Sequence, residues 1–248
     1  AKDSGVYWLR NPGSADATWE RKLLGGRGQE VMFLSVHRDS RAESIQIACA
    51  TLNGKILHFS KKRQDAWTVD EIPLPLGLTA GKAAGLADIN LDGRMDLIVT
   101  TEAQRESKDK VAVAWKENKG EGWKDHAISD LRGRKFDRFE MIDLDGDGDL
   151  DAWVVNFSED RVWINDGFGN YTDSGQALAN PDSWGVALGD LDGDGDLDAW
   201  VANSGPNRVW INDGNGNYND TGQALGNSSS WEVALGDLDG DGDLDAWV

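Results

Sequence analysis

Cysteine, proline and histidine are scarce in this chain of 248 residues, and each shortage excludes a class of structure or site. Cys49 is the only cysteine, so no disulfide can form within the chain and no zinc site built from paired cysteines is possible. Five prolines are too few for a proline-rich linker, and three scattered histidines, His37, His58 and His126, form no pattern typical of a catalytic centre. No apolar run is long enough to cross a bilayer, so we expect no membrane insertion.

Basic side chains are nearly absent from the second part of the chain. From Asp143 onward only Arg161 and Arg208 stand against 23 acidic residues, a net charge of −21, whereas the first 142 residues carry a net charge of +2. A phosphate backbone would be repelled by such a surface, which argues against a nucleic-acid partner. Cations are the expected partners, and we expect each of the two arginines to pair with nearby carboxylates.

The acidic part of the chain is a sequence repeat. The segment Gly189–Val201 reads GDLDGDGDLDAWV, and it recurs at Gly236–Val248 and, almost unchanged, at Ile142–Val154. Residues 143–189 align with residues 190–236 at an offset of 47 positions, with about three quarters of the positions identical. A repeat of this length is typical of solenoids, propellers and other arrays.

Each repeat predicts four short β-strands and no helix. The strands have the sequences SWGVALGD, LDAWVVN, RVWIND and YTDSGQAL, and Gly, Asn and Asp turns separate them. Four such strands make one blade of a β-propeller, so we predict an all-β chain of four-stranded antiparallel blades. The blades are expected at about 31–72, 82–128, 136–178 and 183–225, within a single domain over 1–248. The C-terminal segment 230–248 supplies two strands and the N-terminal segment 6–24 supplies two more.

Those two end segments together would complete a fifth blade and close the ring, which would remove its open strand edges. The alternative is that the chain is a piece of a longer array.

The acidic loop between the first two strands of each blade has the residue types and spacing of a calcium loop. Ca²⁺ takes six to eight oxygen ligands, and carboxylates at positions one, three, five and nine of the loop converge when glycine at position six permits a sharp turn. Four copies provide these predicted side-chain ligands: Asp88, Asn90, Asp92, Asp96; Asp143, Asp145, Asp147, Asp151; Asp190, Asp192, Asp194, Asp198; Asp237, Asp239, Asp241, Asp245. Position seven is expected to contribute its main-chain oxygen only, from Arg94, Asp149, Asp196 and Asp243.

Position twelve of these loops is valine inside a strand, whereas an EF-hand requires glutamate there. Mg²⁺ is less well suited than Ca²⁺ because it keeps a small and largely hydrated octahedron. We therefore predict about four Ca²⁺ sites in β-hairpins; the alternative is a set of solvated acidic turns without metal.

The segment WGVALGDLDGDGDLDAWV resembles the FG-GAP and VCBS repeat families, and the resemblance extends over residues 85–248. It implies a calcium-stabilised extracellular propeller that acts in adhesion, in ligand binding, or as the scaffold of a carbohydrate-active enzyme. Near the N-terminus, VYWLRNPG and WERKLL are similar to propellers of secreted sugar-active proteins of the aldos-2-ulose dehydratase type.

The tryptophans divide into two predicted groups. Trp153, Trp163, Trp200 and Trp210 lie in inner strands and are expected between blades, whereas Trp184 and Trp231 begin a strand and are expected near a rim. The two closely matched repeats differ mostly in the connections 157–160 and 179–182 and their counterparts, which share the face opposite the acidic loops. Since loops on a rigid scaffold often carry function, we expect a partner surface on that face.

The first functional hypothesis is a non-enzymatic module that binds a glycan or an extracellular protein. The alternatives are a propeller scaffold of a carbohydrate-active lyase or dehydratase, and a structural fragment of a larger array. Extracellular modules bind calcium at about 10⁻⁴–10⁻³ M, which cytosolic calcium would not fill, so a secreted or cell-surface location is expected.

Overall fold

The computed structural model describes residues 4–14, 16–40, 43–63, 65–101, 111–129, 136–156, 159–178 and 182–248, with the side chains of 136 and 137 excepted. These residues form twenty β-strands and one 3₁₀ turn, Pro75–Gly77. Within the described part of the chain, no helix has the length and apolar character needed to span a membrane. The predicted all-β class is confirmed.

Sixteen of the strands form four antiparallel four-stranded sheets, each in sequence order. The first contains β3 (Val31–Asp39), β4 (Ser44–Thr51), β5 (Lys55–Lys62) and β6 (Thr68–Pro73). The second contains β7 (Gly81–Ala87), β8 (Asp96–Thr101), β9 (Val113–Asn118) and β10 (Trp123–Ala127). The third contains β11 (Phe136–Ile142), β12 (Asp151–Asn156), β13 (Arg161–Ile164) and β14 (Thr172–Asp173). The fourth contains β15 (Ser183–Gly189), β16 (Asp198–Asn203), β17 (Arg208–Asn212) and β18 (Tyr218–Asp220).

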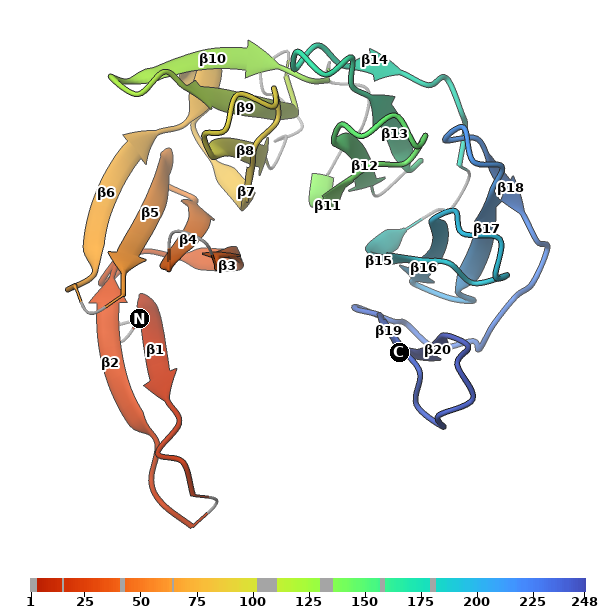
Figure 1. Cartoon of the computed structure of the whole chain (residues 1–248), viewed down its shortest axis with the longest axis horizontal. Coiled ribbons are helices and arrows are strands. Elements are labelled where there is room, and N and C mark those ends of the chain that lie inside the picture. The colour runs from red at the N-terminus through yellow and green to blue at the C-terminus, as the bar shows by residue number, and fades with distance from the viewer. Residues whose placement is uncertain are drawn as a thin grey trace.

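The sheets stand around a common centre as the blades of a propeller (Figure 1). The first strand of each blade, β3, β7, β11 or β15, lies nearest the centre, and the fourth strand, β6, β10, β14 or β18, lies at the outer rim (Figure 1). This arrangement confirms the predicted propeller of four-stranded antiparallel blades.

The chain ends form two separate two-stranded sheets, β1 (Val6–Arg10) with β2 (Glu20–Gly25) and β19 (Ala234–Gly236) with β20 (Asp245–Trp247). The predicted closing blade would join them, but no strand pairing connects them among the described residues, and they stand at opposite ends of the arc (Figure 1). Each pair packs instead on its neighbour in sequence: Val6 shares a buried cluster with Phe59 of the first blade. Packing between blades fixes the rotation from one blade to the next. The total rotation over the array is less than a full turn, so the arc stays open (Figure 1).

The hydrophobic core lies between blades, which explains why the second strands are apolar on both faces. Successive residues of a strand point to opposite faces. In β8, Leu97 and Val99 therefore join the layer toward the first blade, while Ile98 joins the layer toward the third. In β12, Val154 joins the layer toward the second blade and the fully buried Trp153 the layer toward the fourth.

Three of the four predicted inter-blade tryptophans take these positions, whereas Trp200 is partly buried and joins none of the buried clusters. Trp153 and Trp210 are buried members of one layer, and Trp163 packs against the preceding one. Cys49 is fully buried, and burial raises the pKa of its thiol to about 12, so the cysteine is an unreactive part of the core, as its sequence context predicts.

Asp160 is a fully buried acid on the face opposite the acidic loops, between the third and fourth blades. Its Oδ1 accepts a hydrogen bond of 2.9 Å from the Asn156 N–H. Burial raises the pKa of Asp160 to about 7, although the Asn156 N–H and the adjacent Ser183 and Trp153 side chains oppose the shift. In the next blade Asn207 holds the equivalent position and makes the equivalent bond, of 3.0 Å, to the Asn203 N–H.

Replacing this acid should change how stability depends on pH. Since the folded-state pKa lies above the unfolded value, Asp160 favours folding most below about pH 4, and this contribution is lost as pH rises through about 7. We expect Asp160→Asn to increase the free energy of unfolding by about 1–3 kcal/mol at pH 8 and by much less at pH 5. Denaturant melts at both pH values measure the difference.

The matched control is Asn207→Asp, which places the same acid at the equivalent position of the fourth blade. It should lose stability at pH 8 and regain it at acidic pH. Equal effects of Asp160→Asn at both pH values would contradict the assignment of a buried charge.

Candidate metal centres

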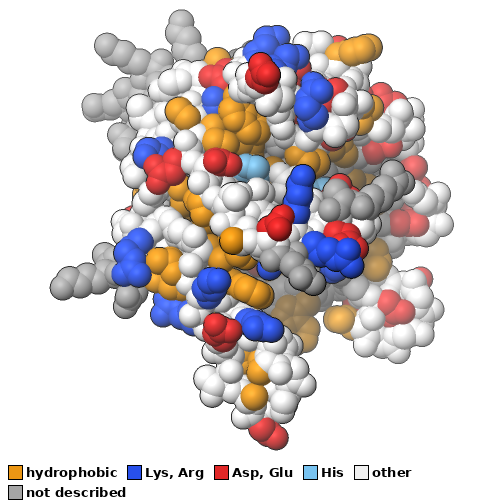
Figure 2. Space-filling view, turned by 60° about the vertical axis from the view of Figure 1, so that its left-hand side comes forward, with side chains coloured by type: hydrophobic (Ala, Val, Ile, Leu, Met, Phe, Trp, Pro, Cys, Tyr) orange, Lys and Arg blue, Asp and Glu red, His pale blue; other side chains and the backbone are white. Residues whose placement is uncertain are grey.

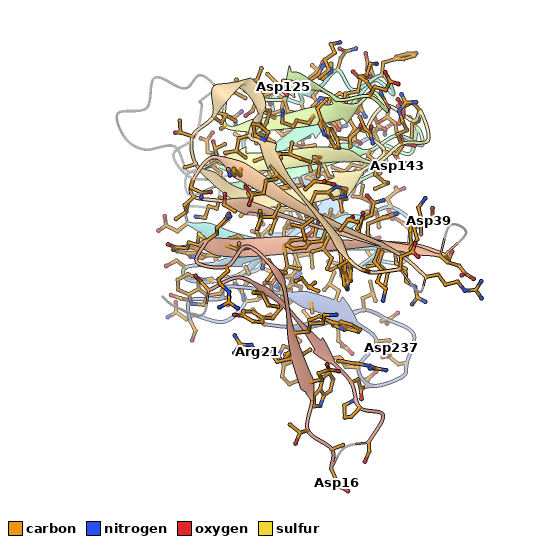
Figure 3. The ribbon with its side chains drawn as sticks, turned by 90° about the vertical axis from the view of Figure 1, so that its left-hand side faces the viewer. Asp16, Arg21, Asp39, Asp125, Asp143 and Asp237 are labelled. Atoms are coloured by element: carbon orange, nitrogen blue, oxygen red, sulfur yellow. The ribbon has the colours of Figure 1, made fainter. Side chains whose placement is uncertain are left out.

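The acidic loops connect the first and second strands of the blades and lie together on one face of the propeller. Asp143 and Asp237, each the first residue of such a loop, point to the same side of the molecule (Figure 3). Asp39, at the corresponding β3–β4 turn of the first blade, lies on this side too, although that turn lacks the acidic pattern (Figure 3). Strands flank every loop, as the valine at position twelve predicts.

Three of the four loops bring carboxylate oxygens close together. In each group, one oxygen from each of three aspartates lies within 4.8 Å of the other two. Two Ca²⁺–oxygen bonds of about 2.4 Å span that distance, and carboxylates are the hard ligands that Ca²⁺ prefers, so the residues fit the ion. The groups are Asp143, Asp145, Asp151; Asp190, Asp192, Asp194; and Asp237, Asp239, Asp245.

In the three loops that begin at Asp143, Asp190 and Asp237, the backbone orients the first aspartate through two glycine N–H groups. In the third blade Asp143 accepts bonds of 2.8 and 3.0 Å from Gly146 and Gly148. Asp190 makes the same pair of bonds in the next loop, and Gly195 at position six has φ +99°, as the predicted sharp turn requires. Both carboxylate oxygens are thus held in place before any ion binds.

Neighbouring carboxylates repel one another in this arrangement. Burial and the charges of Asp147 and Asp143 raise the pKa of Asp145, and burial and Asp194 raise the pKa of Asp192. A bound divalent cation would relieve this repulsion, because it is the largest opposite charge the site can acquire.

The aspartate at position nine has a structural role in addition to its predicted metal role. Asp198 is fully buried and accepts hydrogen bonds from the backbone N–H groups of Leu191 (2.8 Å) and Asn212 (2.9 Å). The equivalent bonds occur at Asp96 and Asp151, where burial raises each pKa to about 6. This residue therefore links the loop to the end of the third strand.

The side chains at position seven are placed differently from loop to loop. Asp149 is buried beside Gly167 of the next hairpin turn, and Asp196 lies against Gly214 in the same way. Asp243 is exposed, as are Asp147, Asp194 and Asp241 at position five.

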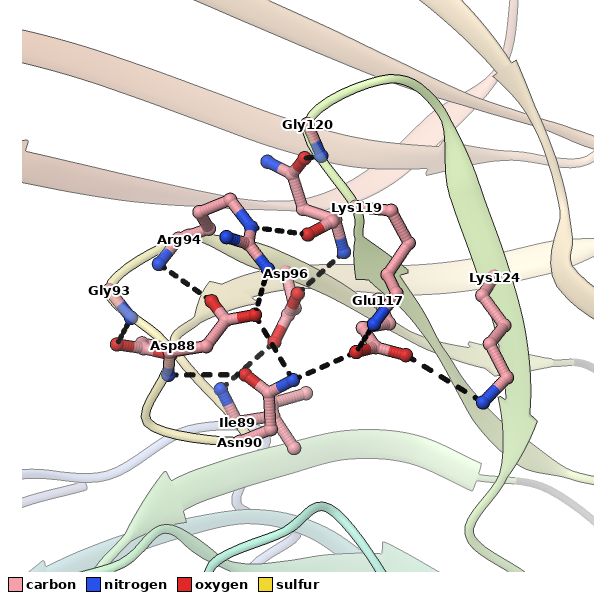
Figure 4. A network of polar contacts seen from close by, with 12 residues as sticks. Asp88, Ile89, Asn90, Gly93, Arg94, Asp96, Glu117, Lys119, Gly120 and Lys124 are labelled. Carbon is pink, nitrogen blue, oxygen red and sulfur yellow. Dashed lines mark hydrogen bonds and ion pairs between the residues drawn. The ribbon is translucent and has the colours of Figure 1, made fainter.

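The remaining acidic loop, residues 88–96 of the second blade, contains a positively charged side chain that lies against one of its predicted ligands. The Arg94 guanidinium pairs with the Asp92 carboxylate and donates a bond of 2.7 Å to the Asn118 carbonyl (Figure 4). The Asn90 amide donates to Asp92 and also to Glu117, which lies within reach of Lys119 and Lys124 (Figure 4). The sequence predicts a main-chain role alone for Arg94, but its side chain lies against a predicted ligand of the same loop.

Two asparagines that sequence reasoning missed join the loops of successive blades. The Asn165 amide donates to the Ile89 carbonyl of the preceding loop at 2.9 Å, and the Asn212 amide donates to the Leu144 carbonyl at 2.9 Å. The two asparagines are 47 positions apart, so their register in the repeat was the available signal. These hydrogen bonds thus tie each of the two loops to the next blade.

The two arginines of the acidic part pair with carboxylates, as predicted. Arg161 lies 2.9 Å from Glu159 and 3.5 Å from Asp173, and Arg208 lies 3.8 Å from Asp220.

The histidines remain apart. His58 bonds to Gln46 at 2.9 Å, and His126 bonds to Glu117 at 3.0 Å, so each has a local partner on its own blade.

Charge is distributed over the surface as the sequence predicts. Lys and Arg side chains alternate with Asp and Glu over the side shown in front in Figure 2, whereas acidic side chains prevail along its right-hand edge. That distribution favours cations over anions near the loops.

Comparison with known proteins adds a family and a fold. The FG-GAP-like repeat matches residues 88–154, 143–201 and 190–248. Each match begins at the first residue of one acidic loop, includes the next acidic loop and ends at the valine in position twelve of that second loop. No curated protein matches the chain.

Two solved structures match the chain, and the first of them is similar in fold. An Agrocybe aegerita lectin, described for its specific recognition of non-reducing terminal N-acetylglucosamine, is 18% identical with a TM-score of 0.60, covering 98% of this chain and 68% of the lectin chain. The Photorhabdus luminescens Tc holotoxin pore is 22% identical with a TM-score of 0.40, covering 93% of this chain and 11% of that one.

Proposed function

The chain belongs to the FG-GAP-like repeat family, and from this premise we propose that it is a calcium-binding propeller module that binds carbohydrate outside the cell. The observation that carries the calcium part is the convergence of three carboxylates in each of three loops. The carbohydrate part is supported by the similarity in fold to a propeller lectin over 98% of this chain.

The four loops are not equivalent as calcium sites. Three present groups of converging carboxylates, whereas the guanidinium of Arg94 already neutralises Asp92 in the loop 88–96. An ion entering that loop would have to displace the arginine and would meet its positive charge. We therefore propose three calcium ions per chain at extracellular concentrations, instead of the four that the sequence pattern predicts.

Replacing Arg94 by the residue found at the same position in the other three loops should create the missing site. We expect Arg94→Asp to raise the stoichiometry measured by isothermal titration calorimetry from three calcium ions per chain to four, because it frees Asp92. Lys124→Asp makes the same change of charge outside the loop and should leave the stoichiometry at three. Four ions bound by the wild-type chain would refute the role assigned to Arg94.

An extracellular location follows from the affinity expected of such loops. Modules outside the cell bind Ca²⁺ at about 10⁻⁴–10⁻³ M, and the cytosol would leave the sites empty. Localisation of the tagged full-length protein in its native cell, by fractionation into cytosol, surface and medium, tests this part of the proposal.

A glycan microarray probed with the labelled full chain in millimolar calcium tests the carbohydrate part. We expect binding to a restricted set of glycans, followed up by solution titration with N-acetylglucosamine as the first monosaccharide. An extracellular-matrix protein array is run in parallel. Binding to proteins alone, or to nothing on either array, would refute carbohydrate binding.

A further inference from the structure

The innermost strands of the four complete blades share an irregularity near their first residues. In β15, Ser183 pairs with Asn203 and Gly185 with Ala202, so the register shifts by one residue at Trp184. In β11 the same shift falls between Phe136 and Arg138. The shifts in β3 and β7 lie within residues 31–34 and 81–84. Such β-bulges redirect side chains and are frequent beside binding sites.

The residues at these bulges meet at one end of the central channel. They line a cavity of about 210 Å³ together with the segment that precedes β19: Phe33, Lys82, Arg138, Trp184, Trp231 and Glu232. Because every innermost strand begins here and ends at its β-turn or acidic loop, the cavity opens on the face opposite the candidate metal centres. We call these six residues the channel mouth.

The repeat itself places an ion pair across the channel mouth. Arg138, Gly185 and Glu232 occupy the same position in three successive repeats, 47 residues apart. The Arg138 guanidinium pairs with the Glu232 carboxylate past the intervening glycine, and it lies 4.9 Å from the Phe33 ring centre. A Cβ on Gly185 would lie 3.2 Å from the Trp231 carbonyl oxygen, so glycine allows this segment to approach.

Two tryptophans form an aromatic wall beside that ion pair. Trp184 and Trp231 also occupy equivalent repeat positions, and their ring centres are 4.4 Å apart with an angle of 44° between the planes. Trp231 is 66% exposed, whereas Trp153 and Trp210 of the repeats are buried. An exposed pair of aromatic side chains bordered by charged groups is a common feature of ligand-binding sites.

We propose that the channel mouth binds the terminal sugar residue of a glycan, an inference that rests on the carbohydrate-binding function proposed above. The indole faces can pack on the C–H face of a pyranose ring, and the ion pair offers donors from Arg138 and acceptors from Glu232 to adjacent hydroxyl groups. Glu232 compensates the charge of Arg138, which favours a neutral sugar over an anionic one.

The size of the cavity agrees with one sugar ring. Pockets for drug-sized ligands enclose about 300–1,000 Å³, so a cavity of about 210 Å³ suits a smaller group. A protein partner would need about 800 Å² of contact surface on each side, far more than these six residues provide.

Substitutions at the aromatic wall and the ion pair test the proposal on the glycans that the wild-type chain binds on the microarray. We expect Trp231→Ala, Trp184→Ala and Glu232→Gln each to weaken binding about tenfold or more, as for central residues of small sites. Trp231→Phe should retain binding within a few-fold because it keeps an aromatic ring.

Trp247→Ala is the matched control, because Trp247 is also highly exposed, at 73%, but lies on β20 outside the channel mouth. It should bind as the wild type does, and thermal melts establish that every variant is folded. Undiminished glycan binding by folded Trp231→Ala and Trp184→Ala would overturn this site while leaving carbohydrate binding intact. Absence of glycan binding by the wild-type chain would overturn both.

Discussion

Removing calcium is expected to lower the melting temperature by about 8–16 °C, since each of the three proposed sites contributes about 1.4 kcal/mol at a tenfold excess over Kd. The physical reason is the repulsion among five aspartates within nine residues, which adds to the effect of burial in raising the pKa of Asp145 and Asp192. Without the ion, each loop must fold against this repulsion. Thermal melts by circular dichroism, in millimolar calcium and in excess EDTA, measure the shift.

Two controls separate calcium from general ionic effects. Magnesium added with EGTA should not restore the melting temperature, since Mg²⁺ prefers a smaller and more hydrated shell. A triple variant, Asp143→Asn with Asp190→Asn and Asp237→Asn, should melt at one temperature in both buffers. An unchanged wild-type melt in EDTA would contradict bound calcium as a source of stability.

The second large effect concerns the buried aspartate at position nine. We expect Asp198→Ala to lower the free energy of unfolding by about 3–5 kcal/mol even in EDTA, because it leaves the N–H groups of Leu191 and Asn212 buried without acceptors. Denaturant melts in EDTA measure this loss independently of metal binding.

Asp245→Ala provides the comparison, because Asp245 holds the same loop position but is partly exposed and, among the described residues, accepts a hydrogen bond only from the Leu238 N–H. In EDTA this substitution should lower the free energy of unfolding by about 1 kcal/mol. In calcium the difference in stability loss between the two variants should become smaller. The reason is that Asp245 belongs to a converging carboxylate group, so its removal also weakens calcium binding, whereas Asp198 belongs to no such group. Equal losses for both variants in EDTA would contradict the structural role of Asp198.

Some of the candidate site could be predicted from spacing alone. Aspartates at alternate positions with glycine at position six define a loop whose ligands are all within nine residues, so local geometry is sufficient. Trp184 and Trp231 were expected near a rim for the same kind of reason, since each begins a strand. The neutralising contact of Arg94 was missed because its position in the loop suggested only a backbone role, while its side-chain rotamer depends on Asp92 and Asn118.

The repeat, the strands, the blade type and the acidic loops were determined by the sequence itself, because each depends on residues close together in the chain. Only the tertiary structure decided which residues of different blades meet: the Asn165 and Asn212 links between loops, the Arg138–Glu232 pair past Gly185, and the separation of β1–β2 from β19–β20. These depend on bulges and on the rotation between packed blades. A small change in the rotation between neighbouring blades accumulates along the array, so it changes which side chains of distant blades come into contact. No local sequence pattern specifies this accumulated rotation.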